Sequence, residues 1–145
     1  MIIRPAGIYI ENDKLLTMRY QYSGKDRYNL PGGNHEDGEE IRAVLAREFT
    51  EELCVEVTVG DLLFTAETLV EGREVLHLLF DITSIIGVPT INIKETTAIE
   101  LVWLGEKSLL NASLYPAIGE NLARLISVSK PTNTHLGRIH QEWIA

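Results

Sequence analysis

The sequence is poor in cysteine and in long apolar runs. A single cysteine, Cys54, among 145 residues excludes an intramolecular disulfide. No stretch approaches the roughly 18 consecutive apolar residues that a membrane-spanning helix needs. The opening MIIRPAGIYI also lacks the basic region and the length of a secretory signal. These absences predict a cytoplasmic protein that has no membrane partner.

Positive charge is also scarce. The chain has 13 Lys and Arg residues against 21 Asp and Glu residues, which gives a formal net charge of −8. Such a protein repels the phosphate backbone of a long nucleic acid unless cations or a local basic patch intervene. A small phosphorylated ligand that arrives with a metal ion remains compatible with this charge.

The rest of the composition is that of a globular protein, with 45% hydrophobic and 23% charged residues. A chain of this length buries about 68–70% of the surface that its unfolded form exposes. We therefore expect one domain over residues 1–145.

Turn residues and apolar runs divide most of the chain into strands. We expect β-hairpins at Glu11-Asn12-Asp13, between strands 6–10 and 15–18, and at Val70-Glu71-Gly72-Arg73, within residues 62–84. Another strand is expected over residues 99–104. Residues 21–29 and 85–97 are expected to be irregular, because they are polar or contain Gly and Pro.

Two segments have the apolar spacing of a helix. The first follows Pro31-Gly32-Gly33 and opens with Asp37 and Glu40, an acidic version of the capping box. The second is expected to begin at Pro116 and to continue to about Val128. The order of strands and helices predicts an α/β protein in which a mixed β-sheet lies between helices.

The first of these helices carries three carboxylates on one face. Glu48, Glu51 and Glu52 are spaced i, i+3 and i+4, where like charges cost roughly 0.2–0.5 kcal/mol per pair. They continue the stripe of Ile41, Val44 and Leu45, which packs against the protein. A solvated acidic patch remains the alternative, but this placement favours a partly enclosed cation site.

The ligands on offer indicate which cation it is. Carboxylate oxygens without paired His or Cys suit Mg²⁺ or Mn²⁺, and Mg²⁺ commonly bridges carboxylates to substrate phosphates. Zinc is disfavoured, because the four histidines share no metal-ligand spacing.

The same residues belong to a longer pattern. Gly33, Glu39, Arg47-Glu48, Glu51-Glu52 and Val55 occur at the spacing of the Nudix box, after a Leu30-Pro31-Gly32 lead-in. The chain therefore resembles the Nudix hydrolase family, and the resemblance implies a Nudix-like α/β/α sandwich. The sequence departs from the box at Phe49, which is bulkier than the usual aliphatic residue, and at Cys54, which replaces glycine at the helix exit. Glycine tolerates the left-handed conformation of a helix C-cap, so Cys54 puts the exit turn in question.

The resemblance also implies roles for individual residues. Members of the family hydrolyse a nucleoside diphosphate linked to another moiety, using Mg²⁺ or Mn²⁺ and a water that attacks phosphorus. By position, Glu48, Glu51 and Glu52 are implied to bind the metal, with the Gly33 carbonyl as a further ligand. Arg47 is implied to hold a carboxylate in place by a charge-assisted hydrogen bond.

The roles of other residues stay open. Glu39 is an outer metal ligand, a partner of Arg47, or a helix N-terminal acid. The general base is a glutamate of the box, with Glu52 favoured, or it is Glu95 or Glu100 from a later segment. The alternative for Glu95 and Glu100 is that they are surface acids. Arg19 and Arg27 are candidates for phosphate contact. We expect Cys54 and Trp103 to pack in the core, whereas Tyr115 is a candidate for stacking on a base.

The substrate itself is not determined. The residues associated with ADP-ribose or with dinucleoside polyphosphates are absent from the segment Thr68 to Gly72, and the coenzyme A pattern is also absent. A nucleoside triphosphate or a nucleotide sugar remains open. Two alternatives are a nucleotide-binding sensor without turnover and a hydrolase of RNA 5′ ends. The tail 130–145, with Leu136, Ile139 and Trp143, either packs on the domain or crosses to a partner subunit as a homodimer.

Overall fold

The strands form two sheets, both of mixed direction. The computed structural model describes residues 1–128 and 130–141. In the first sheet, β1 and β6 are parallel, β6 and β5 are antiparallel, and β5 and β9 are parallel. Its four strands, in spatial order, are β1 (Ile2–Ile8), β6 (Arg73–Ile86), β5 (Glu56–Val70) and β9 (Thr134–Ile139).

The second sheet is built around one central strand. β3 (Lys14–Tyr22) pairs antiparallel with β2, β4 and β7, and β4 pairs in parallel with β8. The other four strands are β2 (Ile10–Glu11), β4 (Lys25–Asn29), β7 (Glu100–Leu104) and β8 (Leu114–Tyr115).

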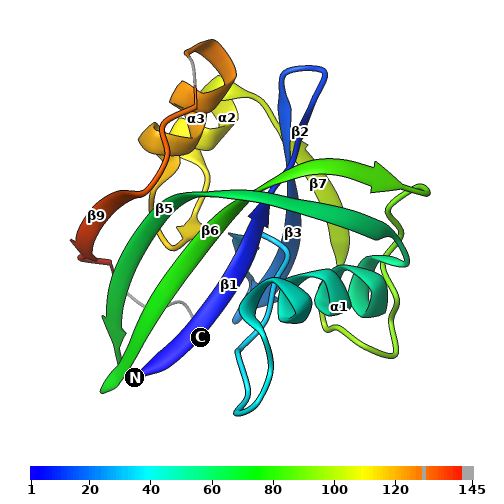
Figure 1. The fold of residues 1–145 in the computed structure, drawn as a ribbon. Coiled ribbons are helices and arrows are strands. Elements are labelled where there is room, and N and C mark those ends of the chain that lie inside the picture. Colours follow the sequence, from blue (N-terminus) through cyan, green and yellow to red (C-terminus); the bar gives the residue numbers. More distant parts are fainter. Residues whose placement is uncertain (129, 142–145) are drawn as a thin grey trace.

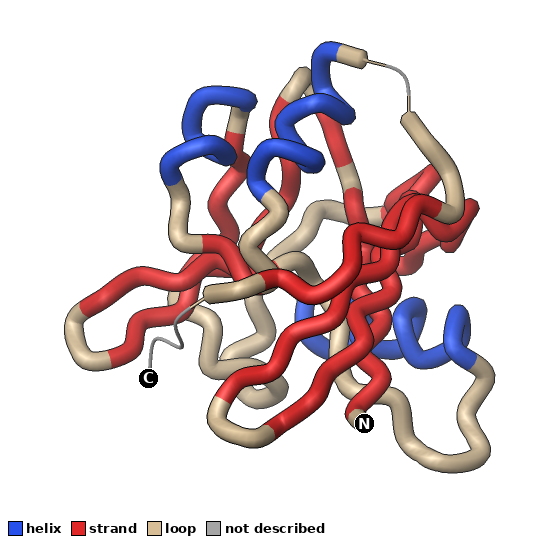
Figure 2. Tube along the Cα trace, turned by 90° about the vertical axis from the view of Figure 1, so that its left-hand side faces the viewer, coloured by secondary structure: helices blue, strands red, loops and turns tan. Residues whose placement is uncertain are grey.

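The helices lie at opposite ends of these sheets. Figure 1 shows α1 (Ile41–Leu53) at one end and α2 (Glu106–Asn111) and α3 (Gly119–Ser127) together at the other. Figure 2 shows the same separation after a 90° turn. The α/β class and the mixed sheet between helices are therefore confirmed, with the strands divided between two sheets.

Each end has its own hydrophobic core. At the α1 end, Leu45, Phe49 and Leu53 are fully buried against residues of both sheets. At the other end, α2 and α3 bury Leu109, Leu122 and Leu125 in a second cluster. Fully burying one such side chain contributes about 1.5–3 kcal/mol, so the periodic apolar residues of α1 fix its position on the sheets.

Three tight hairpins have the same turn. The pairs Asn12-Asp13, Ser23-Gly24 and Glu71-Gly72 each have positive φ at both residues, which is typical of a type I′ turn. The hairpins expected around residues 11–13 and 70–73 are confirmed. The irregular segment expected at 21–29 is wrong, because β3 continues to Tyr22 and β4 begins at Lys25. The polar side chains of these two strands are typical of a loop. The Ser23-Gly24 pair was the local signal of the turn between them.

The helix ends also differ from expectation. Glu40, not Asp37, caps α1, and its Oε2 accepts a hydrogen bond from the Ala43 N–H at 3.0 Å. The second expected helix begins at Gly119 instead of Pro116, and the short helix α2 was not expected. The second expected helix begins later than Pro116 because the chain first pairs as β8 along β4.

Within the described residues 130–141, the C-terminal tail packs on its own domain. β9 pairs with β5, and Leu136 and Ile139 pack against the core beneath α2 and α3. Trp143 lies outside the described residues. No helix within residues 1–128 and 130–141 is long and apolar enough to cross a membrane.

Cys54 ends α1 in the left-handed conformation. Its φ and ψ are 59° and 35°, and its N–H donates to the Thr50 carbonyl at 3.1 Å. The turn is therefore the one for which the family uses glycine, built here with a residue that has a Cβ atom. The core packing expected of Cys54 is wrong, because its side chain is exposed.

We expect Cys54→Gly to stabilise the protein. Relief of the left-handed strain, less the added entropy of the unfolded chain, gives about 0.5–1 kcal/mol. This corresponds to a rise of about 2–4 °C in Tm, measured by thermal unfolding. Cys54→Ala is the matched control, since it removes the thiol and keeps the Cβ atom. A Gly variant that is no more stable than the Ala variant would contradict the strain.

Candidate active site

The C-terminal half of α1 presents the three carboxylates beside its buried face. Phe49 and Leu53 anchor this half in the core. The Glu48 side chain is only 15% exposed, whereas the Glu51 side chain is 41% exposed. The acidic face is thus partly enclosed, as expected.

Gly33 lies directly against Glu48. A Cβ atom at position 33 would lie 2.5 Å from the Glu48 carboxyl carbon, so any other residue here would displace the Glu48 carboxylate from its present position. The Gly33 N–H donates to the Pro5 carbonyl of β1 at 3.2 Å, which fixes the loop in place. The arrangement brings the backbone of Gly33 beside a carboxylate of α1.

Arg47 connects the other acidic groups. Its Nε and Nη2 donate to the two carboxylate oxygens of Glu39 at 3.1 and 3.2 Å. Its Nη1 donates to Glu51 at 3.1 Å and to Glu48 at 3.4 Å. The bidentate pair makes Glu39 a partner of Arg47, one of the roles left open by the sequence.

Burial and mutual repulsion raise the pKa of two of these carboxyls. Loss of solvent raises the pKa of Glu48, and Arg47 only partly opposes this rise. For Glu52, burial first and then the charge of Glu48 raise the pKa from the ordinary 4.5 to about 7. A cation placed here would relieve both effects.

A loop docks on the end of α1 and brings a further acid to it. The Asn92 side chain donates to the Glu51 carbonyl at 3.1 Å, and its backbone N–H donates to the Glu52 carbonyl at 2.9 Å. These bonds satisfy carbonyls that the end of a helix leaves without partners. Glu95, three residues later, lines the same hollow as Glu52, and its charge acts on Glu52.

The carboxylate oxygens suit a hard divalent cation, although they do not all point toward one position. Within the described parts of the chain, no three His, Cys, Asp or Glu side chains converge so that they could hold a metal ion. Arg47 contacts both Glu48 and Glu51, and so occupies carboxylate oxygens that an ion would need. The all-oxygen chemistry and the repulsion at Glu52 fit Mg²⁺ or Mn²⁺, with rotation of these side chains on binding.

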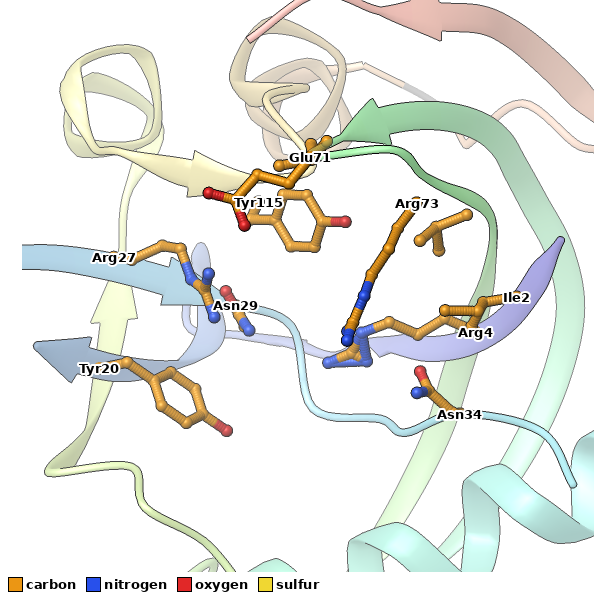
Figure 3. A pocket seen from close by; sticks show the side chains of 11 residues that line it. Ile2, Arg4, Tyr20, Arg27, Asn29, Asn34, Glu71, Arg73 and Tyr115 are labelled. Carbon is orange, nitrogen blue, oxygen red and sulfur yellow. The ribbon is translucent and has the colours of Figure 1, made fainter. Parts of the chain in front are cut away.

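A cationic pocket adjoins this acidic site. It has a volume of about 600 Å³ and contains three arginines, Arg4, Arg27 and Arg73, against one acid, Glu71. Figure 3 shows the guanidinium groups of Arg4 and Arg73 pointing toward one another. Neither forms an ion pair with any residue that the structure describes. Two such guanidinium groups are suited to a phosphate.

Strand register explains how the pocket's polar wall forms. Arg27 pairs with Tyr20 of β3, and Asn29 pairs with Tyr115 of β8. Arg27 and Asn29 are two residues apart on β4 and therefore point to the same face of the sheet. Tyr20 also lines the hollow beside Glu52, so the pocket and the acidic site meet at this ring.

Sequence reasoning brought some of these residues together and missed others. Arg27 and Tyr115 line the pocket, whereas Arg19 forms ion pairs with Asp26 and Glu100, both at 2.9 Å. Trp103 packs against the core at the α1 end. The polar pocket residues that sequence reasoning missed include Arg4, Tyr20, Asn29, Asn34 and Arg73.

Of the two missed arginines, only Arg4 had a weak signal. Arg4 lies between Ile3 and Pro5 in an apolar run, where a charged residue is unusual, whereas Arg73 follows a Glu-Gly turn and precedes Glu74. Only the parallel pairing of β1 with β6 brings these two strands side by side.

Comparisons with known proteins agree with this arrangement. A family model described as the NUDIX domain matches residues 1–125. The chain belongs to the Nudix family. A comparison with curated proteins found no match.

Solved structures of the Nudix fold resemble this one. The E. coli ORF135 protein is 26% identical with a TM-score of 0.74, over 88% of this chain and 89% of that one. The mutator MutT protein of Bacillus halodurans is 19% identical with a TM-score of 0.73, over 94% and 90%. An ADP-ribose pyrophosphatase of Streptococcus suis is 17% identical with a TM-score of 0.63, over 92% and 97%. The two structures below 25% identity support the fold and nothing further.

We expect Glu52→Gln to stabilise the metal-free Nudix domain at neutral and higher pH. Because its folded pKa of about 7 exceeds the ordinary 4.5, the folded state binds more protons between these values. Stability is therefore lost as pH rises from about 4.5 to 7, and an uncharged Gln avoids that loss. Thermal unfolding in a chelator at pH 5 and pH 8 measures the difference.

Glu51→Gln is the matched control for this effect. The Glu51 side chain is 41% exposed and its carboxylate accepts a hydrogen bond from Arg47, so removal of this charge is expected to give no gain in Tm. Equal shifts for the two variants, or a larger gain for Glu52→Gln at pH 5 than at pH 8, would contradict the assignment.

Proposed function

We propose that this Nudix protein is a divalent-metal-dependent pyrophosphohydrolase. Its substrate is a nucleoside diphosphate linked to another moiety, and water attacks phosphorus to cleave the diphosphate bond. The observation that carries this proposal is the junction of an acidic site with a cationic pocket at Tyr20. A diphosphate needs both, since a cation on the carboxylates neutralises some phosphate oxygens and arginines contact others.

Glu48, Glu51 and Glu52 would hold the metal, with the Gly33 carbonyl as a further ligand. When bound, Mg²⁺ or Mn²⁺ neutralises phosphate charge and lowers the pKa of the attacking water. Arg47 keeps Glu39, Glu48 and Glu51 together by hydrogen bonds of 3.1–3.4 Å. In this proposal Arg47 orients the carboxylates and does not contact the phosphate.

The base that takes the proton of water is Glu52 or Glu95. Both line one hollow at the end of α1, and the charge of Glu95 contributes to the raised pKa of Glu52. Glu100 is less suited to this role, because its carboxylate accepts a hydrogen bond from Arg19 at 2.9 Å. Arg19 is likewise engaged, so Arg27, Arg4 and Arg73 are the better candidates for substrate contact.

The pocket favours a small nucleotide-type substrate, such as a nucleoside triphosphate or a nucleotide sugar. Three arginines give it positive charge in a chain of net charge −8. The rest of the chain is therefore acidic on balance, so a long nucleic acid is disfavoured as a partner. We place this activity in the cytoplasm.

We expect Glu51→Gln and Glu52→Gln each to reduce turnover at least about a hundredfold, the scale of a lost electrostatic stabiliser. The assay incubates nucleoside triphosphates, nucleotide sugars and dinucleotides with Mg²⁺, with products identified by mass. The metal is removed with a chelator in parallel reactions, which are expected to show no turnover.

Glu56→Gln is the matched control for these variants. Glu56 is an exposed acid at the start of β5 and is expected to leave turnover unchanged. Full activity of both site variants would contradict the proposed roles. Tight nucleotide binding without turnover of any substrate would instead favour a nucleotide-binding sensor.

A further inference from the structure

The end of the cationic pocket away from α1 has a built wall. Asn29 and Tyr115 are register partners on β4 and β8, and both side chains line the pocket. Arg27 packs on this wall, with its guanidinium carbon 5.4 Å from the centre of the Tyr115 ring. Figure 3 shows these three side chains on the same side of the pocket. The wall therefore combines a ring with an amide.

The ring of Tyr115 is held from behind by the other sheet. The hydroxyl oxygen of Thr68, on β5, lies 3.0 Å from the Tyr115 hydroxyl oxygen. It also lies 2.9 Å from Nε2 of His77, on β6. A hydroxyl has one hydrogen and two lone pairs, so Thr68 can serve both partners at once. The His77 ring also packs edge-on to Tyr115 at 5.1 Å between centres.

This pair is buried and does not change charge near neutral pH. Thr68 and His77 are each 1% exposed. Burial, and then the charge of Arg4, lower the pKa of His77 to about 3. A neutral imidazole therefore faces Thr68 throughout the pH range of ordinary assays, and the position of Tyr115 is fixed.

Asn29 provides an independent sign of a ligand. The residue is 6% exposed, and among the described residues no group forms a hydrogen bond with its Oδ1 atom. Buried polar atoms in folded proteins are almost always paired, so an acceptor left open at a pocket wall calls for a donor from outside. The amide can offer both an acceptor and a donor to one planar partner.

We propose that the end of the pocket formed by Asn29 and Tyr115 is a nucleobase subsite in which Thr68 and His77 position the Tyr115 ring. A nucleobase has a flat face that stacks on an aromatic ring and an edge with adjacent donors and acceptors. A sugar has no such face. The proposal rests on the proposed function: the phosphates extend past Arg4 and Arg73 toward the carboxylates of α1.

Binding without metal tests this subsite independently of hydrolysis. Calorimetry compares the 5′-monophosphates of adenosine, guanosine, cytidine and uridine with ribose 5-phosphate, which has the same phosphate and no base. At least one nucleotide is expected to bind about tenfold more tightly than ribose 5-phosphate, the equivalent of 1.4 kcal/mol. No binding of the four nucleotides, or equal binding of ribose 5-phosphate, overturns the proposal.

Asn29→Leu tests the reading of the base edge. Leu has a similar volume and no polar atoms, so the variant is expected to fold and to lose most of the preference for the nucleotide over ribose 5-phosphate. Asn29→Ser is a second variant, for use if Asn29→Leu does not fold. It is expected to show the same loss of preference for the nucleotide. An unchanged preference in the folded variant overturns the role of Asn29. A protein that binds nucleotides as expected but hydrolyses nothing would overturn the proposed function alone.

Thr68→Val tests the positioning pair. We expect it to weaken nucleotide binding about three- to tenfold, as the loss of one hydrogen bond does, and Thr68→Ser to restore it. Thr17→Val is the matched control, because Thr17 is also fully buried and donates to the Val102 carbonyl, in a different part of the sheet. Its affinity is expected to equal that of the wild type.

A double-mutant cycle separates positioning from general loss of structure. Tyr115→Phe removes the hydrogen bond between Tyr115 and Thr68, and Thr68→Val removes that bond together with the one to His77. The double variant is therefore expected to bind no more weakly than the weaker single variant. In assays with Mg²⁺ and substrate, KM is expected to rise by the same factor with kcat unchanged. Additive losses in the cycle, or an equal loss in Thr17→Val, overturn the role of Thr68 and His77.

Discussion

The close packing of α1 and of the Gly33 loop on β1 is the constraint on which the site depends. A Cβ atom at Gly7 of β1 would lie 2.6 Å from the ring of Phe49, and one at Gly33 would lie 2.5 Å from the Glu48 carboxyl carbon. Glycine at position 7 lets the Phe49 ring of the helix lie directly on the strand, and glycine at position 33 leaves room for the Glu48 carboxylate. Because Arg4 lies on the same strand, this approach also sets its distance from the acidic face.

Arg4 links the two halves of the site electrostatically. Burial raises the pKa of Glu48 and of Glu52, and the charge of Arg4 opposes the rise in both. On the other side, Arg4 adds to the effect of burial in lowering the pKa of His77, its register partner on β6. One cation thus lies within reach of the carboxylates of α1 and of the group that supports Tyr115. The acidic site and the cationic pocket are therefore parts of a single electrostatic unit.

Local signals were sufficient for much of the fold. The apolar spacing of Val44, Leu45 and Phe49 identified α1, and the turn residues around Asp13 and Gly72 identified two hairpins. Where local signals were weak or misleading, the expectations failed. β4 reads as a polar loop because Arg27 and Asn29, on one of its faces, line the pocket instead of packing in a core. The second helix begins later than Pro116 because the chain first pairs as β8 along β4.

The sequence alone determined the identity of the acidic cluster and its spacing, since the positions of Glu48, Glu51 and Glu52 on one helix follow from 3.6 residues per turn. The bidentate contact between Arg47 and Glu39 was among the roles it allowed. Only the tertiary structure decided the pocket. Arg4, Asn29, Arg73 and Tyr115 come from four strands, and the pairing of those strands is a long-range choice that side-chain periodicity does not encode. Their convergence depends on how the two sheets pack, which no local segment of the chain specifies.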